Sequence, residues 1–182
     1  MTQLLERIRA ESIRPALALL PAAMSRNLPQ VEVLMLAATR QEAPNREQCQ
    51  LPVRPGKCGP ARGIWQFEEG GGVRGVLRHA ATRQAAIDLC HALGVEPTVE
   101  GVFAALPKAD GDVLDAGFAR LLFWTHPRPL PALGDVQGAF EYYLATWRPG
   151  AWSRGSKKQR AELREKWAAN YAAALAVVLG AK

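Results

Sequence analysis

Apolar residues recur at helical spacing along most of the chain, and strand-like alternation is rare. The clearest stretch begins after Asp135, where six apolar residues fall at offsets 0, 3, 4, 7, 8 and 11 and so share one helix face: Val136, Ala139, Phe140, Tyr143, Leu144 and Trp147. Capping residues and prolines mark the ends of other helices. The pattern predicts one or two helices within residues 2–24, and helices over 29–42, from Thr82 to about Gly94, from Thr98 to Pro107, from Asp110 or Asp112 toward Trp124, and from Ser156 onward.

Two stretches interrupt the helical pattern. Residues 45–63 form a polar loop rich in proline and glycine, and residues 63–69 predict a short strand or extended turn that ends at Gly70, Gly71 and Gly72. We therefore expect one mainly α domain with a small extended or β element. Its expected parts are N-terminal helices in residues 1–28, a core in residues 29–150 and a basic C-terminal helix in residues 151–182.

The apolar runs are too short to span a membrane. None approaches the roughly 18–20 residues that a transmembrane helix needs. Acidic and basic residues alternate before the first apolar run, and Pro21 interrupts that run, which argues against a signal peptide. We expect no transmembrane segment and a protein that is made in the cytoplasm without an export signal.

The chain is basic. It has 23 Lys and Arg against 17 Asp and Glu, a formal net charge of +6 and a pI near 9.6. Such a surface favours polyanionic partners, whether nucleic acid, anionic lipid or an anionic cell wall, and does not choose among them. Much of the excess lies in one late stretch, although Glu162 and Glu165 interleave with it, and a solvated helix face is the plainer interpretation. The stretch comprises Arg154, Lys157, Lys158, Arg160, Arg164 and Lys166.

Cysteines and histidines give no sign of a metal or cofactor. Cys49 and Cys58 are nine positions apart across the polar loop and could close a small ring under oxidising conditions, whereas Cys90 fits a helix core. The three histidines lack metal-ligand spacing, and the glycines after residue 69 do not match a phosphate-binding loop. We expect no bound metal and no cofactor.

One acidic residue interrupts an apolar helix face. With Val31 set at zero and 100° per residue, Glu42 falls near 20°, within the stripe formed by Leu34, Met35 and Ala38. Desolvation there would raise the pKa of the carboxyl and let it hold a proton near neutral pH, as a general acid requires. Two alternatives remain open: the helix frays before Glu42, or Arg40 or Arg46 forms a structural ion pair with it.

Three motifs give the chain a resemblance to a known superfamily. Gln41-Glu42-Ala43 is followed 24 positions after the glutamate by Gln66, within Ala61-Arg62-Gly63-Ile64-Trp65-Gln66, and Thr146-Trp147-Arg148-Pro149-Gly150 lies further on. Residues 30–150 thereby resemble the lysozyme-like superfamily. The pattern is most similar to goose-type lysozymes, soluble lytic transglycosylases, and phage or prophage members. Three departures stand out: Ala43 replaces a serine, Trp65 replaces a methionine, and Tyr142-Tyr143-Leu144 replaces Ala-Tyr-Asn.

The resemblance implies roles for individual residues in a catalytic core over residues 29–150. Glu42 is the expected general acid and Tyr143 the residue that orients it. An inverting hydrolase also needs a second carboxylate, and Glu68, with Glu69 behind it, is the leading candidate because strand alternation places it on the face of Gln66. A core role for Tyr143 and a solvent-exposed Glu68 stay open as alternatives. The expected substrate-binding residues are Gln66, Trp65, Phe67, Trp147 and Arg148. Strand alternation would turn Trp65 and Phe67 inward, and a core role for Trp147 is also open.

The function expected from the resemblance is that of a phage-type muramidase, which cleaves the bond between N-acetylmuramic acid and N-acetylglucosamine in peptidoglycan. An anionic cell-envelope surface is a second expected partner, with a holin or a virion delivering the protein to the periplasm. A lytic transglycosylase that forms anhydro ends and a non-catalytic cell-wall-binding virion protein are the alternatives. No nucleic-acid-binding motif is present, so a nucleic-acid partner is not expected.

Overall fold

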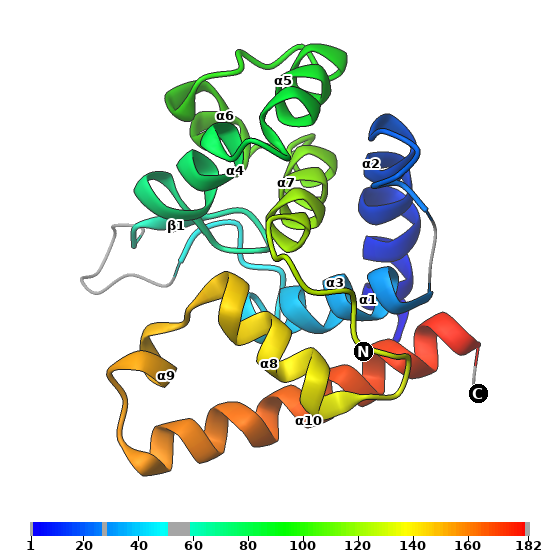
Figure 1. The fold of residues 1–182 in the computed structure, drawn as a ribbon, viewed down its shortest axis with the longest axis vertical. Helices are drawn as coiled ribbons and strands as arrows, with labels where there is room; N and C mark the ends of the chain where they lie inside the picture. The colour runs from blue at the N-terminus through cyan, green and yellow to red at the C-terminus, as the bar shows by residue number, and fades with distance from the viewer. Residues whose placement is uncertain (1, 27–28, 51–58, 181–182) are drawn as a thin grey trace.

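Helix α3 (Pro29–Glu42) occupies the centre of the structure. This computed structural model describes residues 2–26, 29–50 and 59–180. In Figure 1 the long helix α10 (Lys157–Leu179) runs beneath α3, the N-terminal helices stand at one end, and a small β hairpin lies toward the other. The architecture is mainly α with a two-stranded sheet, which confirms the fold class that the sequence predicts.

The N-terminal segment is one continuous helical run with a change of winding. It consists of α1 (Thr2–Arg7), the π-helical segment η1 (Ile8–Ile13) and α2 (Arg14–Leu19). The π-helical turns lie directly before Pro15, which has no backbone N–H to donate to the preceding turn. The predicted helix within residues 2–24 is therefore present and is wider in its middle.

Helix α3 is buried around its whole circumference. Residues 31–39 are all buried, including the polar residues Glu32 and Thr39. The Thr39 hydroxyl donates a hydrogen bond of 2.7 Å to the carbonyl of Ile64, which satisfies a polar group inside the core. The helix begins at Pro29 and ends at Glu42, as predicted, and its last turn carries Glu42 to the edge of this core.

The short strand or extended turn predicted over residues 63–69 is the turn and second strand of a small hairpin. Strand β1 (Ala61–Arg62) pairs antiparallel with β2 (Phe67–Glu68), and residues 63–66 form the turn between them. The chain reverses there because Gly63 adopts φ +73°, a left-handed conformation. The glycines after residue 69 do not form a turn. They lie in the π-helical segment η2 (Glu69–Val73), which continues into α4 (Arg74–Arg78).

Local capping residues start several later helices. The side chains of Thr98 and Asp135 accept hydrogen bonds from the amides of Gly101 and Gly138, and Ser156 forms a capping box with Gln159. These three predicted starts are confirmed. The helices in this part of the chain are α5 (Arg83–Ala92), α6 (Val99–Ala105), α7 (Asp112–Trp124), α8 (Val136–Trp147) and α9 (Gly150–Ser153).

Aromatic side chains join α8 and α10 to the rest of the core. Trp167 of α10 stacks on Tyr143 of α8 with ring centroids 4.7 Å apart, and Phe140 packs beside both. These three rings are fully buried. Across residues 2–26, 29–50 and 59–180, no helix combines the length and the apolar character that a bilayer crossing requires.

Candidate active site

The C-terminal turn of α3 is anchored to α10 by polar contacts. The Gln41 side-chain oxygen accepts a hydrogen bond of 2.8 Å from the Asn170 amide, and the Arg40 guanidinium donates to the Asn170 oxygen at 3.0 Å. The Lys166 ammonium donates to the Gln41 backbone carbonyl at 2.6 Å. This network fixes the backbone immediately before Glu42, so the position of the Glu42 carboxyl is set by α10 as well as by α3.

Tyr143 holds the Glu42 carboxyl from α8. Its hydroxyl donates a hydrogen bond to Oε1 of Glu42. The Tyr143 ring is buried between Trp167 and Trp147, with centroid distances of 4.7 and 6.1 Å and interplanar angles of 23° and 22°. The structure therefore places Tyr143 against Glu42, where the sequence motif predicts it, and the phenol is immobilised by stacking.

The Glu42 carboxyl is partly buried, and this burial has the largest effect on its pKa. Desolvation raises the pKa of Glu42 to about 7 from an ordinary value of 4.5. The hydrogen bond from Tyr143 and the positive charge of Lys166 lower the pKa, and the negative charge of Glu68 raises it. A carboxyl with these properties is half protonated near neutral pH, which suits a general acid.

No structural ion pair neutralises Glu42 in the described part of the chain. The Arg46 guanidinium binds the buried carboxylate of Asp112 instead, and Arg40 is directed at Asn170. Both cations that could have paired with Glu42 are thus engaged elsewhere. Since α3 extends to Glu42 without fraying, neither structural alternative drawn from the sequence describes this residue.

Glu68 lies exposed on β2 and acts on Glu42 through its charge. The structure gives no hydrogen bond between the two carboxyls, and Glu68 makes no ion pair among the described residues. Like-charge repulsion between them opposes ionisation of Glu42. That Glu68 activates a water molecule stays a prediction.

Trp65 and Phe67 are core residues, and the prediction that they contact a substrate is wrong. Their exposed fractions are 0% and 2%. The Trp65 indole N–H donates to the Met35 carbonyl of α3 at 3.0 Å, and Phe67 packs edge-to-face on Phe118 of α7 with centroids 6.3 Å apart. The hairpin thus packs Trp65 against α3 and Phe67 against α7, and both side chains belong to the apolar core.

Gln66 is the one residue of the predicted Trp-Gln-Phe segment that is partly exposed. It adopts φ +53°, and its amide nitrogen donates to the backbone carbonyls of Glu47 and Gly63 at 3.0 and 2.8 Å. These bonds fix the side chain within the turn. Its oxygen accepts no hydrogen bond from the described residues and is the part of Gln66 that remains for a ligand donor.

Trp147 and Arg148 end α8 close to this turn. The Trp147 indole N–H donates to the Trp65 carbonyl at 3.1 Å, so the partly buried ring ties α8 to the hairpin. Arg148 is exposed and takes the left-handed conformation at the helix end. Trp147 therefore joins α8 to the hairpin turn. The Arg148 Nε donates a hydrogen bond of 3.3 Å to the Ala145 carbonyl, and the terminal nitrogens of its guanidinium have no hydrogen-bond partner among the described residues.

Two residues that the motifs did not indicate shape the site. Asp115 of α7 is fully buried, and its Oδ2 accepts a hydrogen bond of 3.1 Å from the backbone amide of Trp65. A β-carbon on Gly63 would lie 2.3 Å from this same carboxyl, so the turn needs glycine there. Burial raises the pKa of Asp115 well above its ordinary value. The other residue is Lys166, which the sequence presents only as part of a basic run.

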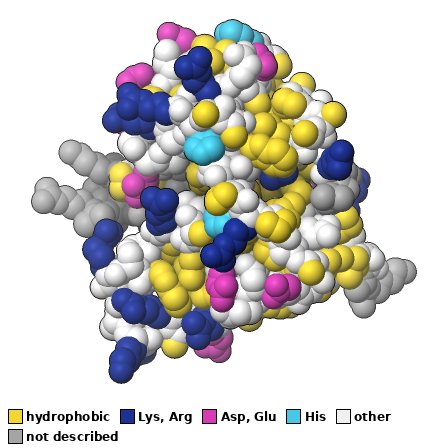
Figure 2. All heavy atoms as spheres, in the orientation of Figure 1, with side chains coloured by type: hydrophobic (Ala, Val, Ile, Leu, Met, Phe, Trp, Pro, Cys, Tyr) yellow, Lys and Arg dark blue, Asp and Glu magenta, His cyan; other side chains and the backbone are white. Residues whose placement is uncertain are grey.

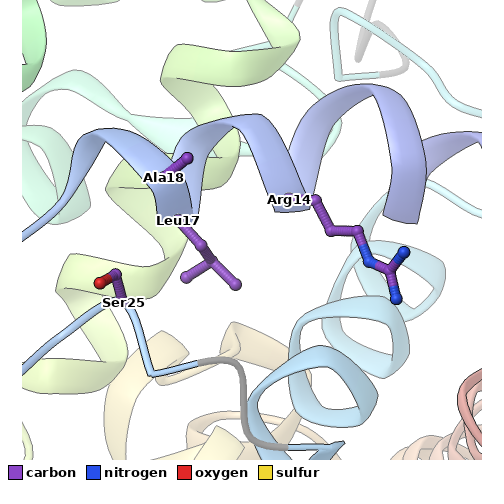
Figure 3. Close-up of a pocket in the computed structure, with 4 residues that line it drawn as sticks. All are labelled: Arg14, Leu17, Ala18 and Ser25. Atoms are coloured by element: carbon purple, nitrogen blue, oxygen red, sulfur yellow. The ribbon is translucent and has the colours of Figure 1, made fainter. Parts of the chain in front are cut away.

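The described residues contain no metal centre and show a pocket elsewhere. No group of three or more His, Cys, Asp or Glu side chains in this part of the chain could hold a metal ion. A pocket lined by Arg14, Leu17, Ala18 and Ser25 lies against α2 and shares no residue with the Glu42 site (Figure 3). The sequence leaves open whether Cys49 and Cys58 close a ring, and Cys58 lies outside the described residues.

Comparison with known proteins gives no relative. The chain matches no protein-family model, no curated protein and no solved structure.

Proposed function

We propose that this protein cleaves glycosidic bonds of peptidoglycan, with Glu42 as the general acid. The observation that carries the proposal is a carboxyl at the end of a buried helix that is in no ion pair among the described residues, with a pKa raised to about 7 and a tyrosine hydroxyl on one of its oxygens. The resemblance implies this same order: a glutamate that ends a buried helix, then a segment carrying Gly and Gln. Helix α3 and the β1–β2 hairpin fit that order.

Tyr143 directs the acidic proton. Burial and the adjacent Glu42 raise the pKa of Tyr143 well above its ordinary value, so the phenol stays protonated and remains a donor. Because Oε1 of Glu42 accepts that hydrogen bond, the carboxyl carries its own proton on Oε2. In the proposed reaction Oε2 gives this proton to the glycosidic oxygen as the bond from that oxygen to the anomeric carbon breaks.

Two outcomes are possible for the sugar after this step. In hydrolysis, water adds to the anomeric carbon and its proton passes to Glu68, the candidate base; we favour this route. In lytic transglycosylation, the 6-hydroxyl of the same sugar adds instead and returns its proton to Glu42. The exposed position of Glu68, without a contact to Glu42, supports keeping the second route as an alternative.

The basic surface supports an anionic envelope as a partner. Figure 2 shows Lys and Arg side chains gathered at its lower left, where Figure 1 places α9 and the first half of α10. Arg160 and Arg164 lie over the Trp152 ring at 5.9 and 5.6 Å, which holds their charges at the surface. Within this proposal, a holin or a virion delivers the protein to periplasmic peptidoglycan.

The test is digestion of purified Gram-negative sacculi, with released fragments identified by mass spectrometry. We expect reducing ends from the wild-type protein and a rate at least ~100-fold lower from Glu42→Gln, because the acid is lost. Tyr143→Phe should be slower by roughly tenfold, the value of one hydrogen bond to a reacting carboxyl. Glu141→Gln, at an exposed position on α8, is the matched control and should match the wild type.

Other outcomes separate the alternatives. Anhydro ends that persist in Glu68→Gln would establish transglycosylation, and loss of fragments in that variant would support hydrolysis. Wild-type protein that binds sacculi without releasing fragments would be a cell-wall-binding protein, and full activity of Glu42→Gln would remove the assignment of the acid. Salt-dependent retention on DNA in place of sacculus binding would point to a nucleic-acid partner.

A further inference from the structure

The C-terminal end of α3 places negative dipoles beside the Glu42 carboxyl. The last carbonyls of a helix have no partner within it and carry a partial negative charge. One of them, at Thr39, accepts a hydrogen bond of 2.7 Å from the Ala43 amide. The carbonyl of Gln41, which immediately precedes Glu42, is bound by the Lys166 ammonium at 2.6 Å from the neighbouring helix α10.

Lys166 is held in this place by the packing of α10 on α3. One turn further along α10, the Asn170 side chain binds both Arg40 and Gln41. One turn earlier, the Leu163 carbonyl accepts a hydrogen bond of 3.4 Å from the side-chain amide of Gln41. Helix α10 is therefore bound to the last turn of α3 on either side of Lys166. Lys166 is exposed to solvent, but its ammonium is held by the Gln41 carbonyl of α3, whereas Lys158 is 87% exposed and pairs with Glu162 of its own helix.

The other charged or titratable groups that face Glu42 do not replace this cation. Tyr143 approaches from α8 with a neutral hydroxyl, and Glu68 contributes a negative charge from β2. Glu47, in the loop after α3, acts through its charge on Lys166. Arg40, on α3 itself, directs its guanidinium to Asn170. Among the described residues, the cation whose charge lowers the pKa of Glu42 is Lys166.

We propose that Lys166 is a positioning residue for Glu42: its ammonium caps the C-terminal carbonyl of α3 and balances the negative groups around the carboxyl, so that Glu42 can release its proton near neutral pH. The consequence for catalysis rests on the proposed function; the effect on the Glu42 proton does not. Without the cation, desolvation, the helix end and Glu68 would all oppose ionisation with no opposite charge to offset them. Glu42 would then be a weaker acid toward the glycosidic oxygen.

The experiment titrates the carboxyl directly. The ¹³C signals of labelled glutamate side chains are followed by NMR against pH, with Glu42→Gln identifying the Glu42 signal. In Lys166→Met we expect the Glu42 midpoint to rise by on the order of one pH unit. Lys166→Arg should keep the wild-type midpoint, because the charge remains. Lys158→Met, on the same helix, should leave it unchanged.

A second variant separates charge from hydrogen bonding and guards against misfolding. Lys166→Gln can still donate to the Gln41 carbonyl but has no charge, so its midpoint should also rise. An unchanged midpoint in folded Lys166→Gln or Lys166→Met overturns the proposal. If sacculi are cleaved, the basic limb of the kcat profile, which is set by loss of the Glu42 proton, should move to higher pH with the midpoint while KM stays near its wild-type value. A shifted midpoint in a protein that cleaves no glycan would refute the proposed function and leave the role of Lys166 standing.

Discussion

Helix α3 carries a glutamate at each end, and the structure treats the two in opposite ways. Glu32, in the first turn, is 2% exposed and binds two guanidinium groups: Arg9 at 2.6 Å and Arg14 at 3.1 Å. Glu42, in the last turn, is in no ion pair among the described residues and accepts a hydrogen bond from Tyr143. Both carboxyls are withdrawn from water, yet only the first receives compensating charge in contact.

The difference shows why one buried carboxyl stabilises the fold through ion pairs while the other keeps a proton that it can transfer. An acid at a helix N-terminus is favoured by the helix dipole, and two arginines complete the neutralisation of Glu32. At the C-terminus the dipole opposes a negative charge, and Lys166, whose charge lowers the pKa of Glu42, binds a backbone carbonyl rather than the carboxylate. The charge of Glu32 is used to join η1 and α2 to α3, whereas the proton of Glu42 remains available for transfer.

The largest effect on stability is expected for Glu32, at the N-terminal end of α3. Glu32→Gln leaves two guanidiniums without their carboxylate, and removing one partner of a buried pair costs about 3 kcal/mol in the free energy of unfolding. Urea denaturation at pH 7 measures it. Glu11→Gln is the matched control, since its pair with Arg7 is exposed and should contribute less than about 0.5 kcal/mol. A Glu32→Gln protein as stable as the wild type would contradict the structural role of this pair.

Glu42→Gln, at the C-terminal end of α3, should change the free energy of unfolding in the opposite direction and stabilise the protein. Because the pKa of Glu42 is about 7 in the folded protein and 4.5 ordinarily, the folded state binds more protons between these pH values, and stability falls as pH rises through this window. The gap corresponds to at most about 3 kcal/mol. Glu42→Gln removes this penalty, so the variant should be more stable than the wild type at pH 8 and equally stable at pH 4. Urea denaturation at both pH values checks this; no gain at pH 8 would mean that Glu42 ionises without cost.

Local signals explain which parts of this comparison the sequence could predict. The limits of α3 follow from Pro29 and Pro44, and the starts of α8 and α10 follow from Asp135 and Ser156, because each cap acts within its own turn. Glu42 stood out because an acid within an apolar stripe conflicts with the helix pattern. Tyr143 could be paired with it through the motif and its inward face.

The parts that could not be predicted depend on contacts between distant segments. The turn at residues 63–66 is held by Asp115, 50 positions beyond Trp65, so the residues next to Trp65 do not reveal that the chain turns back there instead of continuing as a strand. Lys166 lies 125 positions beyond Gln41, and nothing in its own neighbourhood distinguishes it from the other lysines of the basic run. Asp115 had a signal of the kind that revealed Glu42, since it interrupts the apolar pattern of α7.

The smallest effect is expected for Glu68, whose negative charge acts on Glu42 at the C-terminal end of α3. Glu68→Gln removes a negative charge that raises the pKa of Glu42, so the Glu42 midpoint in the NMR titration should fall, opposite in direction to the shift expected for Lys166→Met. Because Glu68 is exposed, the free energy of unfolding should change by less than about 0.5 kcal/mol. Glu69→Gln, at the adjacent exposed position, is the control and should leave the midpoint in place. A midpoint that stays unchanged in Glu68→Gln would mean that solvent screens the two carboxyls from each other, and Glu42 would then owe its raised pKa to desolvation without help from Glu68.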